Sequence, residues 1–394
     1  MADTVRIGVI GAGNMGSAHL SCIHEGPVRG LVVSAVCDTD HVRLDAIRRQ
    51  YPDVCAFDDP NDMLSAGNLN AVLIATPHRQ HAALGIRAFA QGLHVLCEKP
   101  LDVSITKAQA LIRAAQDGGC VFGIMLNQRT DPLFARARQI VQSGQLGSMH
   151  RTVWIVTNWL RSQKYYDSGG WRATWSGEGG GVLLNQAPHQ LDLWQWICGM
   201  PVAVSAICDT AKYHRIEVED DALITARFAT GATGVFITST GDCPGTNRLE
   251  IDGERGKLVL EHGELHLWQT AQPCAELIQM SQEMFPDGNC THTVFRPVAP
   301  AAAHRGILQN FTDAILHGTP LLAPGEDGLN ELMLSNAAYL SAWRGGELLA
   351  LPPDGALFDR MLAERAAASA GEHAAAEDRR ISTAGYSERW QVRW

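Results

Sequence analysis

Short apolar runs and amphipathic segments alternate over the first third of the chain. Each apolar run is rich in β-branched residues and is bounded by turn residues, as expected for a buried strand. Strands are predicted at residues 5–10, 31–37, 54–57, 70–76, 92–100 and 120–125. Helices are predicted between them, at residues 17–25, 42–50, 59–66, 81–91 and 104–116. This alternation predicts an α/β domain with a parallel, doubly wound sheet, which we assign to residues 1–126.

The pattern changes after residue 149, where strands follow one another with turn residues between them. They are predicted at residues 151–157, 202–210, 222–228, 234–240, 247–252 and 257–260. Turn signals such as Thr230-Gly231 and Asp252-Gly253 suit hairpins. Residues 270–300 show no periodicity and are predicted to be a loop, and amphipathic helices are expected at 304–317 and 329–344. We therefore place a second domain at residues 127–352.

The last segment, residues 353–394, is alanine-rich after Pro352-Pro353 and predicts a helical arm. It ends in two tryptophans, Trp390 and Trp394, that alternate with charged residues. We interpret this end as a strand or hook that packs on a neighbouring subunit; a frayed tail is the alternative. A homodimer or homotetramer is the expected assembly.

Composition and charge narrow the class of ligand. The formal net charge of −10 argues against nucleic acid, which favours a basic surface, and suits a small polar or neutral molecule. The ten cysteines include no Cys-x-x-Cys pair, so neither a zinc site nor a disulfide scaffold is expected. Reduced thiols, no visible signal peptide and no membrane-spanning apolar run predict a cytoplasmic protein without a membrane partner.

A glycine motif, Gly11-Ala-Gly-Asn-Met-Gly16, follows the first predicted strand directly and opens a helix. Gly11 permits the tight turn, Gly13 lets the backbone approach a pyrophosphate, and Gly16 allows close packing of helix on strand. The amides of the helix start, with Asn14 and Met15, would face the phosphates. The context of strand, turn and helix makes a dinucleotide site more plausible than a simple glycine turn.

An acidic residue marks the end of the second strand. Asp38 lies roughly 20 residues beyond the glycines, where a carboxylate can accept hydrogen bonds from both ribose hydroxyls. Thr39 and Asp40 follow it instead of an arginine, so a 2′-phosphate would meet like charge. The predicted cofactor is NAD, which is favoured over NADP.

Polar residues also follow the later strands of this sheet. Ligands bind at the carboxyl edge of parallel sheets, so the turns at residues 76–77, 98–100 and 127–129 should line one crevice. The cofactor side is assigned to Thr76, Pro77, His81, Glu98 and Lys99.

The stretch from residue 178 to 201 carries a second glycine run, Gly179-Gly-Gly181, and then a helical pattern that ends at Gly199 and Pro201. Asn185, His189 and Asp192 are spaced i, i+4 and i+7, which predicts that they project from one helix face. Two plainer interpretations stay open: Asn185 as a helix cap, because Pro188 suits a first turn, and His189 with Asp192 as a solvated stripe. A metal site lacks a third ligand.

The glycine motif, Glu98-Lys99-Pro100 and the stretch at 179–192, in this order, resemble the glucose–fructose oxidoreductase/inositol dehydrogenase/rhizopine-catabolism (Gfo/Idh/MocA) family over about residues 5–350. The resemblance implies an N-terminal Rossmann domain and a C-terminal α/β domain on a large, mainly antiparallel open sheet. It implies NAD(P)-dependent chemistry on a hydroxyl of a sugar, cyclitol or glycoside.

The resemblance also implies a catalytic lysine from the Glu-Lys-Pro triplet and an Asp-x-x-x-His pair. Lys99 and His189 match it, whereas Asn185 replaces the aspartate and puts a carboxylate role there in doubt. The Asn-Gln-x-Pro-His form is similar to members that act on glycosides and anhydrosugars, such as levoglucosan dehydrogenases, which oxidise the C3 hydroxyl.

Aromatic residues cluster at 158–178, before the second glycine run. Such faces suit the C–H surface of a sugar, so Tyr166, Trp171 and Arg172 are predicted to contact substrate, together with Arg129 from the crevice. Trp159 is assigned to the core.

The predicted reaction is oxidation of a secondary hydroxyl of a sugar, glycoside or cyclitol. His189 would act as general base, Lys99 would stabilise the developing alkoxide, and Asn185 would bind an adjacent hydroxyl as donor or acceptor. Asp192 either orients His189 or is a surface carboxylate. Two alternatives remain: an NAD-assisted glycosidase that oxidises its sugar transiently, and a non-catalytic ligand-sensing regulator.

Overall fold

The computed structural model describes residues 4–26 and 28–369. Its N-terminal half contains a six-stranded sheet in the order β3-β2-β1-β4-β5-β6, and all neighbouring strands are parallel. The strands are β1 (Val5–Ile10), β2 (Leu31–Cys37), β3 (Cys55–Phe57), β4 (Ala71–Ile74), β5 (His94–Cys97) and β6 (Phe122–Ile124). The helices are α1 (Asn14–Glu25), α2 (His41–Gln50), α3 (Pro60–Ser65), η1 (His78–Gln80), α4 (His81–Ala90), α5 (Ile105–Gly118), η2 (Asn127–Thr130) and α6 (Pro132–Gln142).

The strand order reverses between β1 and β4, where the chain starts its second half of the sheet. In a doubly wound sheet this is the point at which a nucleotide binds, beyond the carboxyl ends of the strands. Strand β4 is buried along its whole length, which explains its continuous apolar sequence. The predicted parallel α/β fold is confirmed.

The second half of the chain forms a mixed sheet of nine strands, ordered β14-β13-β12-β11-β7-β10-β9-β8-β15. Only β7 and β10 pair in parallel; the other neighbours are antiparallel. The strands are β7 (Met149–Val156), β8 (Ala203–Thr210), β9 (Glu219–Arg227), β10 (Thr233–Ser239), β11 (Asn247–Gly253), β12 (Gly256–Glu261), β13 (Glu264–Gln269), β14 (Thr291–Phe295) and β15 (Leu349–Ala350). Its helices are α7 (Gln163–Tyr166), the π-helical turn η3 (Val182–Gln186), α8 (Pro188–Cys198), α9 (Cys274–Met280), α10 (Ala303–His317), η4 (Gly325–Asp327), α11 (Gly328–Trp343) and α12 (Gly355–Ser369).

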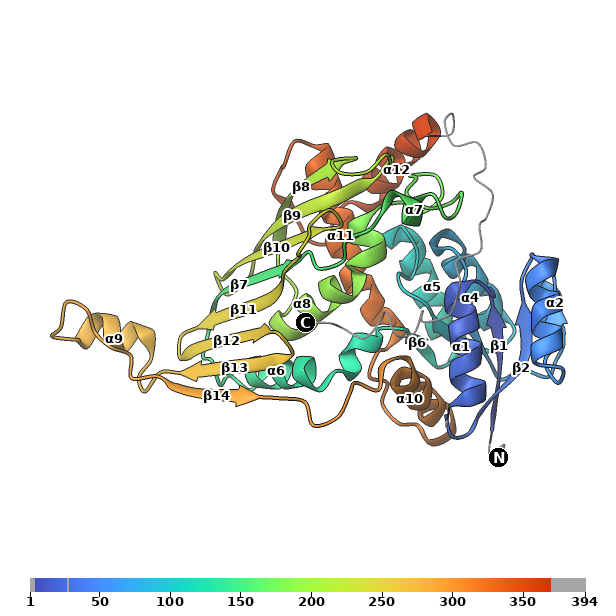
Figure 1. Cartoon of the computed structure of the whole chain (residues 1–394), viewed down its shortest axis with the longest axis horizontal. Coiled ribbons are helices and arrows are strands. Elements are labelled where there is room, and N and C mark those ends of the chain that lie inside the picture. Colours follow the sequence, from blue (N-terminus) through green and yellow to red (C-terminus); the bar gives the residue numbers. More distant parts are fainter. Residues whose placement is uncertain (1–3, 27, 370–394) are drawn as a thin grey trace.

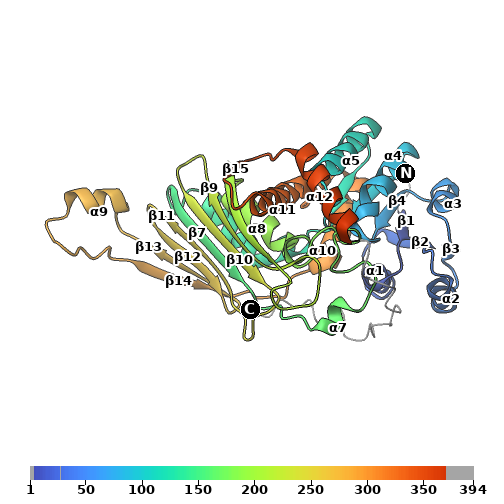
Figure 2. The same ribbon diagram turned by 90° about the horizontal axis from the view of Figure 1, so that it is seen from above.

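Helices cover one face of this large sheet and join it to the first domain (Figures 1 and 2). Helix α8 packs against α6 and α11, and α11 reaches both strand β8 and helix α5 of the N-terminal half. Strand β11 alternates buried and half-buried residues, as expected for a sheet with one covered face. Helix α11 lies between the two sheets and bonds both sides: Asn336 donates to the carbonyl of Val103 in the first domain, and Ser341 accepts from the amide of Ala206 in β8.

Three predictions about the second half need correction or fall outside the structure. The segment 270–300 is not a plain loop: it contains α9 and β14 and projects from the edge of the sheet (Figure 1). Strand β13 was also missed, although its buried leucines alternate with half-buried residues. The tail with Trp390 and Trp394 lies outside the described residues. Among the described helices, none is long and apolar enough to cross a lipid bilayer.

Candidate active site

The glycine turn after β1 leaves room for a ligand at one of its three glycines. A Cβ on Gly11, whose φ is +94°, would lie 2.7 Å from the carbonyl oxygen of Ala75, and a Cβ on Gly16 would lie 1.8 Å from that of Gly11. These two glycines are therefore required by packing. A Cβ on Gly13 would meet only the Arg43 guanidinium, at 3.8 Å. The open space beside Gly13, at the start of α1, is where a pyrophosphate would approach the backbone.

Asp38 closes the other side of this turn. Its Oδ2 accepts a hydrogen bond from the amide of Ala12 at 2.6 Å and its Oδ1 accepts from that of Asp40 at 2.8 Å. Arg43, from the first turn of α2, lies 3.8 Å from Asp38 and 3.2 Å from Asp40. Sequence reasoning missed Arg43 because only the fold of α2 brings it back over the glycine turn.

The carboxyl edge of the parallel sheet carries buried polar atoms that have no partner among the described residues. They include Oγ1 of Thr76, after β4, and Oδ1 of Asn127, after β6. Unpaired buried polar groups are costly, so a polar ligand at this edge would satisfy them. These atoms, the open space at Gly13 and the start of α1 with Asn14 and Met15 fit a dinucleotide.

Two residues assigned to the cofactor are engaged elsewhere. Both ring nitrogens of His81 lie 2.7 Å from backbone carbonyl oxygens, those of Pro100 and Thr76, so His81 ties two turns of the crevice together. Glu98 contacts His19 of α1 at 2.7 Å. Burial raises the pKa of Glu98, but the hydrogen bond and charge of His19 outweigh it and lower this pKa to about 2. We therefore withdraw direct cofactor contact for His81 and for the Glu98 side chain. Pro77 stays half-buried in the turn before η1.

Lys99 links the two domains at the centre of the site. Its Nζ donates to the backbone carbonyl of Asn185 at 2.7 Å. His189 is four residues further on, in the first turn of α8, and is close enough for the charge of Lys99 to act on it. The ammonium from the first domain thus binds the backbone four residues before the imidazole of the second.

Burial sets the protonation of both groups. It lowers the pKa of His189 to about 3, with the charge of Lys99 acting in the same direction, so the imidazole is neutral at neutral pH. Burial also lowers the pKa of Lys99, against the opposing charges of Glu98, Glu331 and Glu178. Nδ1 of His189 is buried without a partner among the described residues. A neutral imidazole of this kind can accept a proton.

The helix predicted through Asn185, His189 and Asp192 is interrupted. Residues Val182–Gln186 form a π-helical turn and α8 begins at Pro188, so Asn185 neither caps α8 nor shares its face. The Asn185 side chain instead donates to Oε1 of Glu178, and to the hydroxyl of Tyr165 at 3.3 Å. The predicted alignment of the three polar residues was wrong because the spacing count assumed an unbroken α-helix.

Asp192 and Arg129 form a buried pair, which corrects the roles predicted for both. Nε and Nη2 of Arg129 donate to the two oxygens of Asp192 at 2.8 and 2.6 Å, and Nη1 donates to Asp327 at 2.6 Å and to the carbonyl of Leu322. Both side chains are 1% exposed. Asp192 therefore neither orients His189 nor faces solvent, and the Arg129 guanidinium holds η2, α8 and η4 together instead of meeting a substrate.

Residues of the aromatic cluster at 158–178 differ in burial: some lie in the core and others stay near the site. Tyr166 is 5% exposed and its hydroxyl bonds Oγ1 of Thr240, so we withdraw it as a substrate contact. Trp171 and Arg172 are half-buried, and Trp171 lies edge-on to His78 with ring centroids 5.7 Å apart. They stay candidates for substrate contact.

Three further residues join the site that had not been chosen as candidates from sequence. Glu178 and Tyr165 contact Asn185, and Glu331 of α11 is fully buried near Lys99 with no hydrogen-bond partner among the described residues. Burial raises the pKa of Glu331 well above its usual range. A glutamate in an amphipathic helix is expected at the surface, so no local feature of the sequence indicates that Glu331 is buried.

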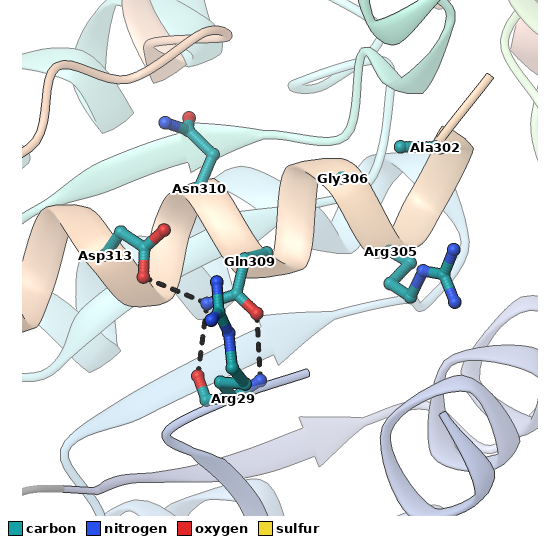
Figure 3. Close-up of a pocket in the computed structure, with 7 residues that line it drawn as sticks. All are labelled: Arg29, Ala302, Arg305, Gly306, Gln309, Asn310 and Asp313. Atoms are coloured by element: carbon teal, nitrogen blue, oxygen red, sulfur yellow. Dashed lines mark hydrogen bonds between the residues drawn. The ribbon is translucent and has the colours of Figure 1, made fainter. Parts of the chain in front are cut away.

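A surface cavity elsewhere is separate from this site. It has a volume of about 420 Å³ and lies on α10 beside Arg29, Gln309 and Asp313 (Figure 3). None of the predicted site residues lines it. The candidate active site is therefore defined by the convergence of side chains and not by this cavity.

Comparison with known proteins agrees with this geometry. The model of an oxidoreductase family with an NAD-binding Rossmann fold (GFO/IDH/MocA) matches residues 5–126, and that of the GFO/IDH/MocA C-terminal domain matches residues 134–259. The myo-inositol 2-dehydrogenase of Thermotoga maritima is 24% identical over 342 residues, covering 86% of this chain and 96% of that protein. The levoglucosan dehydrogenase of Pseudarthrobacter phenanthrenivorans is 26% identical over 294 residues, covering 66% of this chain and 74% of that protein.

Among solved structures, the WlbA dehydrogenase from Bordetella pertussis in complex with NADH and UDP-GlcNAcA is similar. It has a TM-score of 0.74 and 25% identity, and the match covers 89% of this chain and 100% of that one. The glycine turn and Lys99 lie in the part matched by the first family model, and Asn185 and His189 in the part matched by the second. This chain therefore belongs to the GFO/IDH/MocA oxidoreductase family and is an NAD-dependent enzyme that acts on CH–OH groups.

Proposed function

We propose that this enzyme oxidises a secondary hydroxyl of a sugar, glycoside or cyclitol. The observation that carries the proposal is the bond from Lys99 of the first domain to the backbone of Asn185, four residues before His189 in the second. Relatives that share most of the chain are named as inositol and levoglucosan dehydrogenases. Within this class we propose the C3 hydroxyl of a pyranoside as the position oxidised.

Bound NAD would supply the hydride acceptor of the reaction. The chain's own residues would handle the proton and the charge. His189 would take the hydroxyl proton at Nε2, because Nδ1 is buried and the neutral imidazole has no other bond partner among the described residues. The Lys99 ammonium would lie against the same oxygen and stabilise the negative charge that develops there.

Trp171 and Arg172 would cover one side of the ring. Their half-buried positions and their contacts with His78 and Tyr165 support this role. The cofactor side would consist of the turn at Gly11, Gly13 and Gly16 with Asp38, as predicted from sequence. A homodimer or homotetramer in the cytoplasm stays a prediction.

The test is incubation of the purified protein with NAD and a panel that includes myo-inositol, levoglucosan and methyl glycosides, following reduced cofactor at 340 nm. Lys99→Met and His189→Ala should each lower kcat by about 10²–10⁴-fold while NAD affinity is kept. Lys107→Met, an exposed lysine on α5, is the matched control.

Other outcomes identify the alternatives. Release of an aglycone from nitrophenyl glycosides without net NADH would indicate the NAD-assisted glycosidase. Binding of sugars without any turnover would indicate the regulator. Near-normal activity of either variant would refute the proposed roles.

A further inference from the structure

Glu178 is a buried carboxyl whose two oxygens have different donors. It is 1% exposed. Its Oε2 accepts from the backbone amide of Ala173 at 2.6 Å, and its Oε1 accepts from the side-chain amide of Asn185. The nearest cation is the Arg172 guanidinium, at 3.9 Å from Oε1. Glu178 is thus held in place by its own loop and directed at a residue of the active site.

This contact determines which way the Asn185 amide points. A carboxylate oxygen only accepts hydrogen bonds, so the NH₂ group of Asn185 must face Glu178. The same nitrogen lies 3.3 Å from the Tyr165 hydroxyl, which Arg172 at 3.1 Å and Gln186 at 3.2 Å also approach as donors. The NH₂ group of Asn185 is therefore directed into the protein, toward Glu178 and Tyr165.

The remaining atom of the amide is Oδ1. It is solvent-accessible and receives no hydrogen bond from any described residue. It belongs to the residue whose backbone carbonyl binds Lys99. Asn185 therefore carries an unused side-chain acceptor, and its backbone carbonyl is bound by the Lys99 ammonium.

We propose that Glu178 is a positioning residue that fixes Asn185 as an acceptor, so that the site selects substrates with a hydroxyl donor at the carbon next to the one oxidised. The inference rests on the proposed function, and it settles the choice between donor and acceptor that the sequence left open for Asn185. A hydroxyl can donate to Oδ1, whereas a fluorine, hydrogen or methoxy group cannot.

Reversing the pair tests this assignment. In Asn185→Asp, two carboxyl oxygens face each other and kcat/KM should fall by about 10–100-fold. Glu178→Gln must keep its oxygen on the Ala173 amide, so its NH₂ faces residue 185. The double variant restores a donor–acceptor pair with the acceptor still directed at the ligand, and kcat/KM should return to within about threefold of the parent. Asp167→Asn removes an exposed acid of the same segment and is the control.

Glu178→Gln alone should invert the Asn185 amide and present its NH₂ to the ligand. For whichever of myo-inositol or levoglucosan is turned over, deoxy and deoxyfluoro derivatives at the adjacent carbon serve as probes. The parent enzyme should disfavour both equally. The Glu178→Gln variant should favour the fluoro over the deoxy compound by about 3–10-fold, because fluorine can accept from NH₂.

Thermal unfolding of the parent, the two single variants and the double variant, measured without substrate, distinguishes the possible results. Recovery of both thermal stability and kcat/KM in the double variant supports the proposal. Recovery of stability alone would show that Glu178 only holds its loop, and recovery of neither would show that the contact is absent; each result overturns the proposal. A parent protein that is inactive on the whole sugar panel, with the stability cycle intact, overturns the proposed function and this inference with it.

Discussion

The two glycine-rich stretches of this protein look alike in sequence but differ in what their glycines face. In the turn at residues 11–16, the side of Gly13 is open except for one flexible guanidinium at 3.8 Å. In the run at residues 179–181, every glycine faces protein. Added Cβ atoms would lie 2.6 Å from Val103, 2.2 Å from the Tyr339 hydroxyl and 1.9 Å from the Glu219 carbonyl.

The first stretch therefore makes space for a ligand and the second makes space for the protein itself. The second run lets the chain pass between α11, β9 and the loop after β5, and this close passage places Asn185 against Lys99. A further difference appears along residues 178–192: Asn185 is half-buried and bonds Glu178, whereas Asp192 is buried in the core with Arg129. Glycine content alone does not distinguish a binding loop from a packing loop.

The largest expected effect on stability concerns the buried pair of Asp192 and Arg129. Asp192→Ala leaves the Arg129 guanidinium buried without its main partner, so it should lower the free energy of unfolding by about 3–5 kcal/mol in denaturant titrations. Asp252→Ala removes the partner of the largely exposed Arg151 and should cost at most about 1 kcal/mol. Equal small losses would place Asp192 outside the core.

The next prediction compares the stability cost of adding a methyl group at a tightly packed glycine and at an open one. Gly181→Ala puts a methyl group 1.9 Å from a backbone carbonyl that cannot move freely, so it should cost about 1–3 kcal/mol or more of unfolding free energy. Gly170→Ala, where nothing lies within 4 Å of the added Cβ, is the control and should be close to neutral. Wild-type stability of Gly181→Ala would remove the contrast between the two stretches.

The binding glycine should show the opposite behaviour. Gly13→Ala adds a methyl group only to the open side of the turn, at an ordinary backbone φ of −69°. The dissociation constant of NAD should rise by about 10–100-fold, since the methyl group keeps the pyrophosphate from the backbone. The unfolding free energy without cofactor should stay within about 0.5 kcal/mol. Titration of NAD with parallel denaturation measures both, and unchanged NAD affinity would contradict the binding role.

The smallest expected effect is a pH dependence of the unfolding free energy that arises from the buried His189. The pKa of His189 is lowered from 6.5 to about 3, so between these values the unfolded chain binds a proton that the folded chain does not. Stability should therefore fall as pH is lowered from 6.5 toward 3. His189→Gln should make this fall shallower in denaturation series at pH 7 and 5, whereas His41→Gln, an exposed histidine, should not. An unchanged slope in His189→Gln would show that its imidazole is not held neutral by burial.

Much of the architecture could be predicted from the chain itself. Apolar runs separated by amphipathic segments predicted the parallel sheet, because each buried strand must be apolar on both faces. The glycine motif was recognisable because its conformational demands are local: Gly11 needs its positive φ and Gly16 its missing side chain wherever the motif occurs. The projecting segment with α9 and β14 was missed because β14 is largely exposed and carries little periodic signal.

Candidate residues of the site could be chosen from the sequence, but the partners that their side chains bond could not. Lys99 and His189 were chosen from sequence, and Lys99 bonds the backbone four residues before His189. Arg129 was predicted to contact substrate, and Asp192 either to orient His189 or to lie at the surface, but the two side chains bond each other. Their contact joins positions 63 residues apart, and the bond from Arg129 to Asp327 spans 198 residues. No spacing rule reaches that far.

The sequence by itself determined most of the elements, the parallel character of the first sheet and the conformation of the glycine turn, because these depend on neighbouring residues and on the burial of apolar surface. Only the tertiary structure decided which polar groups bond each other within the protein and which stay available to a ligand. A buried charge must find a partner, and its partner depends on how distant helices pack. The same condition turned the Asn185 amide toward Glu178.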